Sequence, residues 1–167
     1  MDKQMSSLAD KLRSGQFVIT SELSPPKGTD TSALEATAAL LSGHIDAFNL
    51  TDSAASKMSL SPLAAASLLL KHGVEPILQM TTRDRNRIAL QGDMLGAWVL
   101  GVKNLVCMGG DPPHLGDHPD AKPVFDLSTE ELILAAHKLN NGTDLMDNPL
   151  NKSCDFHIGA LVNPGAD

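Results

Sequence analysis

Short apolar runs alternate along the chain with longer segments in which hydrophobic residues recur every three or four positions. The short runs predict strands over residues 17–23, 47–51, 76–82, 104–108 and 156–162, and the first of these runs is rich in β-branched and aromatic residues. The longer segments predict helices over residues 31–41, 61–72, 86–101 and 128–139. Strand ends recur about every 27–30 residues, the length of a βα unit. The pattern therefore predicts a single α/β domain with parallel strands.

Polar residues gather at the carboxyl ends of the predicted strands, the edge at which both barrels and doubly wound sheets bind ligands. This set comprises Glu22, Thr51, Asp52, Ser53, Gln79, Thr81, Thr82, Gly109, Gly110, Asp111, Asn163 and Pro164. Burying a carboxylate is costly unless partners compensate for the lost hydration. Glu22 and Asp111 are therefore the strongest candidates for chemistry, and capping of the following loop is the alternative for each.

The charge balance narrows the classes of partner. The chain has 13 basic and 20 acidic residues, a net charge of −7 and no basic run, which argues against nucleic-acid binding.

Its two cysteines, Cys107 and Cys154, have no metal-ligand spacing, and we expect Cys107 to be a small core hydrophobe. This cysteine usage favours a reducing cytoplasm. No apolar window of about 18 residues predicts a membrane span, and the first residues do not resemble a signal peptide.

Three loop segments leave their chemistry open. Residues 83–87 read Arg-Asp-Arg-Asn-Arg and could form either a phosphate clamp at a helix N-terminus or a solvated cluster of ion pairs. His114, Asp117 and His118 could bind a metal, although a solvated loop is the favoured interpretation. The glycines at 109–110 permit either a tight turn or close approach of the backbone to a bulky ligand.

Four motifs, in their order and spacing, resemble those of the methylenetetrahydrofolate reductase family of the bacterial, FAD-dependent type. They follow the first four predicted strands and occupy residues 21–27 (SELSPPK), 49–54 (NLTDSA), 79–87 (QMTTRDRNR) and 110–113 (GDPP). The family is built on a TIM (β/α)8 barrel, so the resemblance implies that fold, with about five βα units present.

The resemblance implies flavin-dependent reduction of 5,10-methylenetetrahydrofolate to 5-methyltetrahydrofolate in one-carbon metabolism and methionine biosynthesis, in the cytoplasm. Glu22 would be the general acid that protonates the folate N10, so that the ring opens to an iminium able to accept hydride from reduced FAD. Burial in an apolar strand-end pocket would suit a carboxylic acid to that role. Asp111 would hydrogen-bond the pterin beside the flavin. The positions implied to contact FAD are Thr51, Asp52, Ala54, Gln79, Gly109, Gly110 and Asp111, with Phe125 and Asp126 matching more loosely; no metal is implied.

The chain departs from the enteric members of the family at three positions. Gln79 stands where they carry His, Gly109 replaces an Arg, and Leu161 stands near a Tyr position. The electron donor stays open between NADH, NADPH and a partner redox protein, and the chain could form a homo-oligomer or pair with another reductase subunit. Two other functions stay open: a non-catalytic folate-binding or docking subunit of a multisubunit reductase, and a metal-dependent barrel hydrolase.

The length of the chain sets one further expectation. A complete (β/α)8 barrel needs about 250 residues, whereas this chain has 167 and five predicted strands. A doubly wound sheet would suit that length better, yet the order of the motifs favours the barrel. We therefore expect residues 1–167 to be the N-terminal part of one barrel domain, incomplete at its C-terminus. Expressed alone, it would expose two unpaired edges and be unstable or aggregate.

Overall fold

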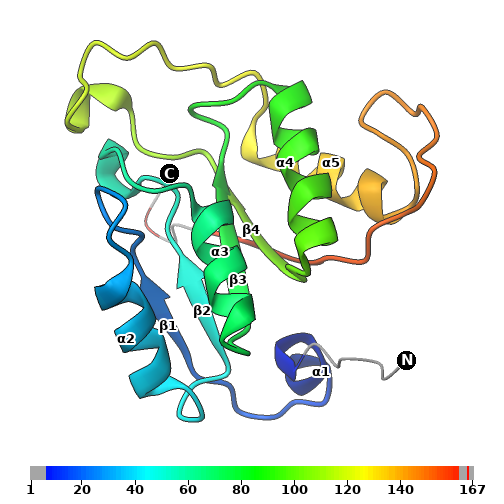
Figure 1. Ribbon diagram of the computed structural model, residues 1–167. Helices are drawn as coiled ribbons and strands as arrows, with labels where there is room; N and C mark the ends of the chain where they lie inside the picture. Colours follow the sequence, from blue (N-terminus) through cyan, green and yellow to red (C-terminus); the bar gives the residue numbers. More distant parts are fainter. Residues whose placement is uncertain (1–6, 162–164, 166–167) are drawn as a thin grey trace.

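The computed structural model describes residues 7–161 and 165, in which four helices cover one face of a five-stranded parallel sheet (Figure 1). The strands pair in chain order, and they are β1 (Thr20–Leu23), β2 (Ala47–Leu50), β3 (Pro76–Thr81), β4 (Asn104–Met108) and β5 (His157–Ala160). A doubly wound sheet reverses its strand order at a switch point, and this sheet does not. The fold is therefore that of consecutive βα units of a (β/α)8 barrel, as the sequence predicts.

The four covering helices each connect one strand to the next, and they are α2 (Ser32–Leu41), α3 (Pro62–Lys71), α4 (Arg87–Leu100) and α5 (Thr129–Asn140). Local signals set several of their ends. The Asn86 side chain accepts hydrogen bonds from the first turn of α4, and Gly101 ends that helix in a left-handed conformation with φ 104°. Ser128 and Glu131 form a capping box at the start of α5.

The sheet face toward these helices carries the main hydrophobic core. Leu23, Leu50, Leu78 and Leu105 occupy one register row across β1–β4, and none of these side chains is more than 9% exposed. The buried residues of α2–α5 pack against this row in one continuous cluster. Cys107 belongs to the same cluster, and burial raises the pKa of its thiol to about 12, which confirms the prediction of a core residue.

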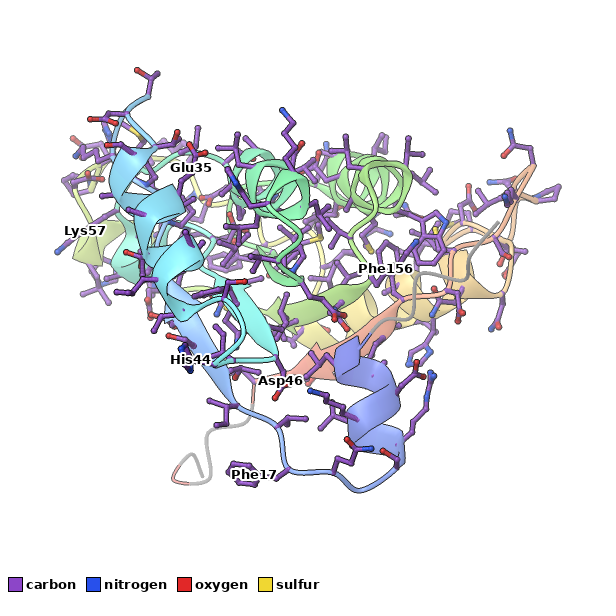
Figure 2. The ribbon with its side chains drawn as sticks, turned by 60° about the horizontal axis from the view of Figure 1, so that its bottom comes forward. Phe17, Glu35, His44, Asp46, Lys57 and Phe156 are labelled. Atoms are coloured by element: carbon purple, nitrogen blue, oxygen red, sulfur yellow. The ribbon has the colours of Figure 1, made fainter. Side chains whose placement is uncertain are left out.

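The opposite sheet face is covered by α1 (Ser7–Arg13), a helix that we did not predict. This helix lies at the amino-terminal ends of the strands, called the lower end of the sheet below. Leu8 is buried against Ala47 and Ile77 in a second, smaller cluster, and its backbone N–H donates to Glu75 Oε2 over 3.2 Å. Lys11 pairs with Asp46. Asp46 lies in the loop before β2 and is labelled in Figure 2. The amphipathic spacing of Leu8 and Leu12 was the signal available in the sequence.

The first strand is shorter than the sequence predicts. Residues 17–19 lie outside β1, and the Phe17 side chain is 88% exposed and projects away from the sheet (Figure 2). The reason is that β2 begins only at Ala47, so the backbone before Thr20 has no strand beside it. The carboxylate of Asp46 instead accepts a hydrogen bond from the Ile19 N–H over 2.7 Å.

The last strand packs through an aromatic contact. The ring of Trp98 on α4 meets that of Phe156, just before β5, edge to face with centroids 5.2 Å apart. Lys103 Nζ lies 3.3 Å from the centroid of the Trp98 ring, and burial lowers the pKa of this lysine. β5 ends at Ala160, and Val162, the last residue of the predicted strand, lies outside the described residues, as do Asn163 and Pro164. Among residues 7–161, no helix combines the length and apolar character needed to cross a membrane.

Candidate functional site

The loops that follow β1, β2 and β4 meet at the carboxyl end of the sheet and enclose a hollow of about 510 Å³. Its wall combines apolar side chains, hydroxyls and two lysines: Ser24, Pro25, Lys27, Thr51, Ala54, Ala55, Lys57, Met58, Ser59 and Asp117. A larger hollow of about 850 Å³ lies at the opposite end, among the helix-to-strand loops, but it contains none of the candidate residues. We therefore place the candidate site at the carboxyl edge, where parallel strands bind ligands.

Glu22 lies on the sheet face that α2–α5 leave uncovered. It pairs in register with Asn49, one position away from the row of core leucines. Its side chain is exposed, so the expectation of a buried carboxyl in an apolar pocket is wrong for the described structure. The physical reason is that this end of the uncovered face has no layer over it among residues 7–161, whereas α1 covers only the lower end.

Asp52 is buried and its carboxylate is occupied by the chain itself. Oδ2 accepts hydrogen bonds from the Thr81 N–H over 2.8 Å and from Thr81 Oγ1 over 3.0 Å, and it pairs with the Arg85 guanidinium. Thr51, also buried, donates through Oγ1 to Ser24 Oγ over 3.2 Å. These bonds join the ends of β1, β2 and β3, so Asp52 is a bridge between strands while Thr51 faces the hollow.

The short helix η1 (Ala54–Ser56) follows Asp52 in an unusual backbone conformation. Ser53, Ala55 and Ser56 all have positive φ, at 51°, 52° and 55°. Non-glycine residues adopt this conformation only when surrounding contacts impose it. Ala54, implied to contact FAD, is thereby exposed at the wall of the hollow.

The segment that contains Asp111 begins with the two glycines. Gly110 has φ 88°, and a Cβ on it would lie 3.0 Å from two carbon atoms of Thr81. The tight-turn interpretation therefore holds at this position. Asp111 is exposed, and its backbone carbonyl accepts hydrogen bonds from Ser56 Oγ and from Arg83 Nη1. The segment continues into the short helix η2 (Pro113–Leu115), which packs against η1.

The remaining candidates lie around the end of β3. Gln79 is half-buried and pairs in register with Val106 on the uncovered face. Phe125 is 43% exposed, and its N–H donates to Thr82 O over 3.2 Å. Asp126 is held by Arg87, whose Nε and Nη2 approach the two carboxylate oxygens to 2.8 and 3.0 Å. Hydrogen bonding by Arg87 lowers the pKa of Asp126 to about 2.

The three arginines of residues 83–87 all pair with acidic side chains. Arg83 pairs with Asp84, Arg85 with Asp52 and Asp93, and Arg87 with Asp126. The N-terminus of α4 is satisfied by Asn86. The contacts thus favour the ion-pair interpretation over the phosphate clamp, with one correction: Arg83 is only 3% exposed, so the cluster is not fully solvated.

The segment 114–118 is tied to neighbouring loops. Asp117 pairs with Lys27 and accepts a hydrogen bond from the Met58 N–H over 3.0 Å, and the contact with Lys27 lowers the pKa of Asp117 to about 2. His118 lies 4.0 Å from the same carboxylate. Within the part of the chain that the structure describes, no three His, Cys, Asp or Glu side chains are placed to hold a metal ion.

The lining of the hollow suits a flavin. Pro25, Ala54, Ala55 and Met58 provide apolar surface, while the Thr51 hydroxyl provides a hydrogen-bonding group. Such a combination, in a volume of a few hundred Å³, is typical of cofactor pockets. Asp52 and Asp126, which the resemblance places near the cofactor, are both neutralised by arginines and so do not present free charge to a diphosphate.

Comparison with known families gives a match that covers most of the chain. The model of the methylenetetrahydrofolate reductase family matches residues 7–144 of the 167-residue chain. The matched region begins at α1, includes all four motifs and ends just beyond α5. A search of curated proteins gives no match.

Proposed function

Because the chain belongs to the methylenetetrahydrofolate reductase family, we propose that it reduces 5,10-methylenetetrahydrofolate to 5-methyltetrahydrofolate with FAD as its bound cofactor. The observation that carries this proposal is the hollow at the carboxyl edge of the sheet, which the family motifs after β1 and β2 line together with Asp117. The motif after β4 is joined to its rim, because the Ser56 hydroxyl donates to the Asp111 carbonyl. Reduced flavin supplies the hydride when it is bound. The protein must supply a proton, orient the folate and hold the cofactor.

We assign the proton to Glu22 and the orientation of the pterin to Asp111. Glu22 stands at the end of β1 on the uncovered face, where a bound ligand can reach its carboxyl group. Protonation of the folate N10 opens the five-membered ring and creates the iminium that accepts hydride. Bound cofactor and folate would also exclude water from the space around Glu22.

The same proposal distributes the contacts to FAD. Thr51, Ala54 and Gln79 would contact the cofactor from β2, its loop and β3, while Gly109 and Gly110 would contact it through their backbone after β4. Asp52 and Asp126 would contact it through their backbones, because their carboxylates already accept hydrogen bonds from the chain. Phe125 would contribute its exposed ring.

The wider context is part of the proposal as well. We place residues 1–167 in one barrel domain and the reaction in the cytoplasm, in one-carbon metabolism that supplies methionine. Either NAD(P)H or a partner redox protein would reduce the flavin. The purified chain should therefore carry FAD, or take it up, and show a visible flavin spectrum.

The decisive experiment separates the two half-reactions in a Glu22→Gln variant. Anaerobic stopped-flow should show folate reduction slowed at least about 100-fold, because general acid catalysis contributes about 10²–10⁴. Flavin reduction by the electron donor should stay within about twofold of wild type. Glu130→Gln, which changes an exposed carboxylate on α5, is the matched control and should leave both half-reactions unchanged.

Two results would count against the proposal. If Glu22→Gln leaves folate reduction intact, the assignment of the acid is wrong. If the wild-type chain neither carries FAD nor takes it up, the flavin-dependent reaction is wrong. Folate binding by that flavin-free chain would then support the folate-binding subunit instead.

A further inference from the structure

One buried guanidinium connects the two loops that contain Ala54 and Asp111. Arg83 is 3% exposed, although it lies just beyond the end of β3 at the edge where ligands are expected. Nη1 donates to Ser56 Oγ over 2.9 Å and to the Asp111 carbonyl over 3.3 Å, and both terminal nitrogens lie 3.4 Å from the Ser53 carbonyl. The remaining side of the guanidinium pairs with Asp84, which raises the pKa of Arg83 and keeps it charged.

The loop after β2 needs such an external support. Ser53, Ala55 and Ser56 all adopt left-handed backbone conformations, which are unfavourable for non-glycine residues because Cβ crowds the backbone. A conformation of this kind persists only where neighbouring groups over-determine it. The contacts from Arg83 reach the first and the last residue of this strained turn, so they act where the strain is held.

The loop after β4 is fitted to the same turn. The Ser56 hydroxyl donates to the Asp111 carbonyl, and Arg83 donates to both of these oxygens, so the three residues form a closed triangle of hydrogen bonds. At Gly116 a Cβ atom would lie 1.8 Å from the Ser56 carbonyl oxygen, so the two loops touch backbone to backbone. Figure 1 shows η1 and η2 side by side at this end of the sheet.

We propose that Arg83 is a positioning residue for the reductase site: it holds the turn at 53–56 and the segment at Asp111 in the relative arrangement that FAD and folate require. The inference rests on the proposed function, because Ala54 and Asp111 are assigned to cofactor and pterin there. A planar fork with several donors can serve two loops at once, whereas the single ammonium of a lysine cannot reach the same set of acceptors. Arg83 therefore acts through its neighbours and contacts neither ligand.

The first test measures FAD affinity by calorimetry in the full chain. We expect Arg83→Met to raise the dissociation constant about tenfold or more, and Arg83→Lys to recover only part of the loss, because charged hydrogen bonds to both loops are removed or rearranged. Ser56→Ala, which removes only the shared hydroxyl, should raise it about threefold. Asp84→Asn is the matched control: it alters the exposed partner of the same guanidinium and should change the affinity by less than about twofold.

The second test needs no cofactor. Lys57 follows the strained turn and projects from it at the rim of the molecule (Figure 2), so tryptic cleavage at Lys57 reports the order of the loop. Flavin-free Arg83→Met should be cut there at least about fivefold faster than wild type, since a locally opened loop is the better substrate. Cleavage at Lys152, exposed in the distant loop before β5, should not change and serves as the internal control.

A third measurement distinguishes positioning from a general structural role. With FAD saturating, Arg83→Lys should raise the KM for methylenetetrahydrofolate at least about threefold while the rate of flavin reduction by the donor stays the same. A fall in kcat alone, at unchanged KM, would mean that the variant merely lowers the amount of folded protein and would overturn the proposal. If Arg83→Met does not fold, Ser56→Ala takes its place in the affinity and cleavage tests.

The failure of this inference is separable from that of the proposed function. A wild-type chain that takes up no FAD overturns the proposed function and the positioning role together. If the wild-type chain binds FAD and both Arg83→Met and Ser56→Ala bind it with the wild-type affinity, the positioning role alone is overturned.

Discussion

The two faces of the same strands differ in nearly every property. On the face toward α2–α5, the row of leucines from Leu23 to Leu105 is at most 9% exposed. One residue away, the row on the other face starts with the exposed Glu22 and continues through the half-buried Asn49. Because side chains alternate along a strand, a shift of one position separates residues that stabilise the fold from residues available to a ligand.

The second face is itself divided between its two ends. At the lower end, α1 buries Ala47 and Ile77, and Asn104 beneath it is 1% exposed. At the carboxyl end the strands stop at hydroxyls, glycines and paired charges. Burial by α1 therefore decides which polar residues of this face stabilise the fold. Position in the register row of Glu22 does not decide it, because Asn104 belongs to the same row.

The largest effect should come from truncating the core face. Leu105→Ala leaves a cavity among packed side chains and should lower the free energy of unfolding by about 2–5 kcal/mol. Val106→Ala is the matched control on the next residue, which points to the other face and is half-buried; we expect a loss of about 1 kcal/mol. Urea unfolding followed by circular dichroism would measure both. Equal losses would show that the two faces do not differ as described.

A middle-sized effect should come from the polar residue under α1. Asn104 Nδ2 donates to Glu75 Oε1 over 2.8 Å, and Glu75 in turn accepts from the Leu8 N–H of α1. Asn104→Ala should therefore destabilise the chain by about 1–3 kcal/mol and loosen α1. Asn49→Ala, on the same row and half-buried, should cost less than about 0.5 kcal/mol. Hydrogen exchange of the α1 amides, alongside urea unfolding, would show whether the helix is released.

The smallest effect should come from the charge pairs at the carboxyl end, and it should depend on pH. Arg87 lowers the pKa of Asp126 to about 2, below the ordinary aspartate value of about 3.9 in an unfolded chain. The pair therefore stabilises the fold fully above about pH 4, and the contribution is lost as the pH falls through about 2.

Asp126→Asn should thus be less stable than wild type at neutral pH, with the difference vanishing at about pH 2. Unfolding curves at several pH values would measure it. Asp120→Asn, at an exposed position that takes part in none of the ion pairs found among residues 7–161, should show no such convergence. A difference that persists at low pH would mean that Arg87 and Asp126 contribute through packing alone.

Most of the fold could be predicted from the sequence because its signals are local. The capping box at Ser128, the cap at Asn86 and the glycine at 101 mark helix ends wherever the chain folds. The short apolar runs likewise mark four of the five strands closely. α1 was missed because one short amphipathic stretch gives little periodicity, and the start of β1 was misplaced because pairing depends on where β2 begins.

The site was less predictable because its properties depend on contacts between distant loops. The residue types at strand ends predict a site at the carboxyl edge of the sheet, and the structure gathers the loops after β1, β2 and β4 there. The burial of Asp52 and Arg83 depends on partners about thirty positions away, which no local pattern reveals. The exposure of Glu22 depends in the same way on what covers its face, a property of the assembled layers and not of the first motif.

The packing of Trp98 against Phe156 has an optical consequence. The chain contains one tryptophan and no tyrosine, so its near-ultraviolet absorption and its intrinsic fluorescence arise almost entirely from one indole. That indole touches the ring before β5 and lies under the Lys103 ammonium, so its emission reports the junction of α4 with the last strand. Against so weak a background, a bound flavin would dominate the absorption spectrum. Energy transfer from Trp98 to that flavin would quench the tryptophan fluorescence, so the emission intensity would measure cofactor occupancy.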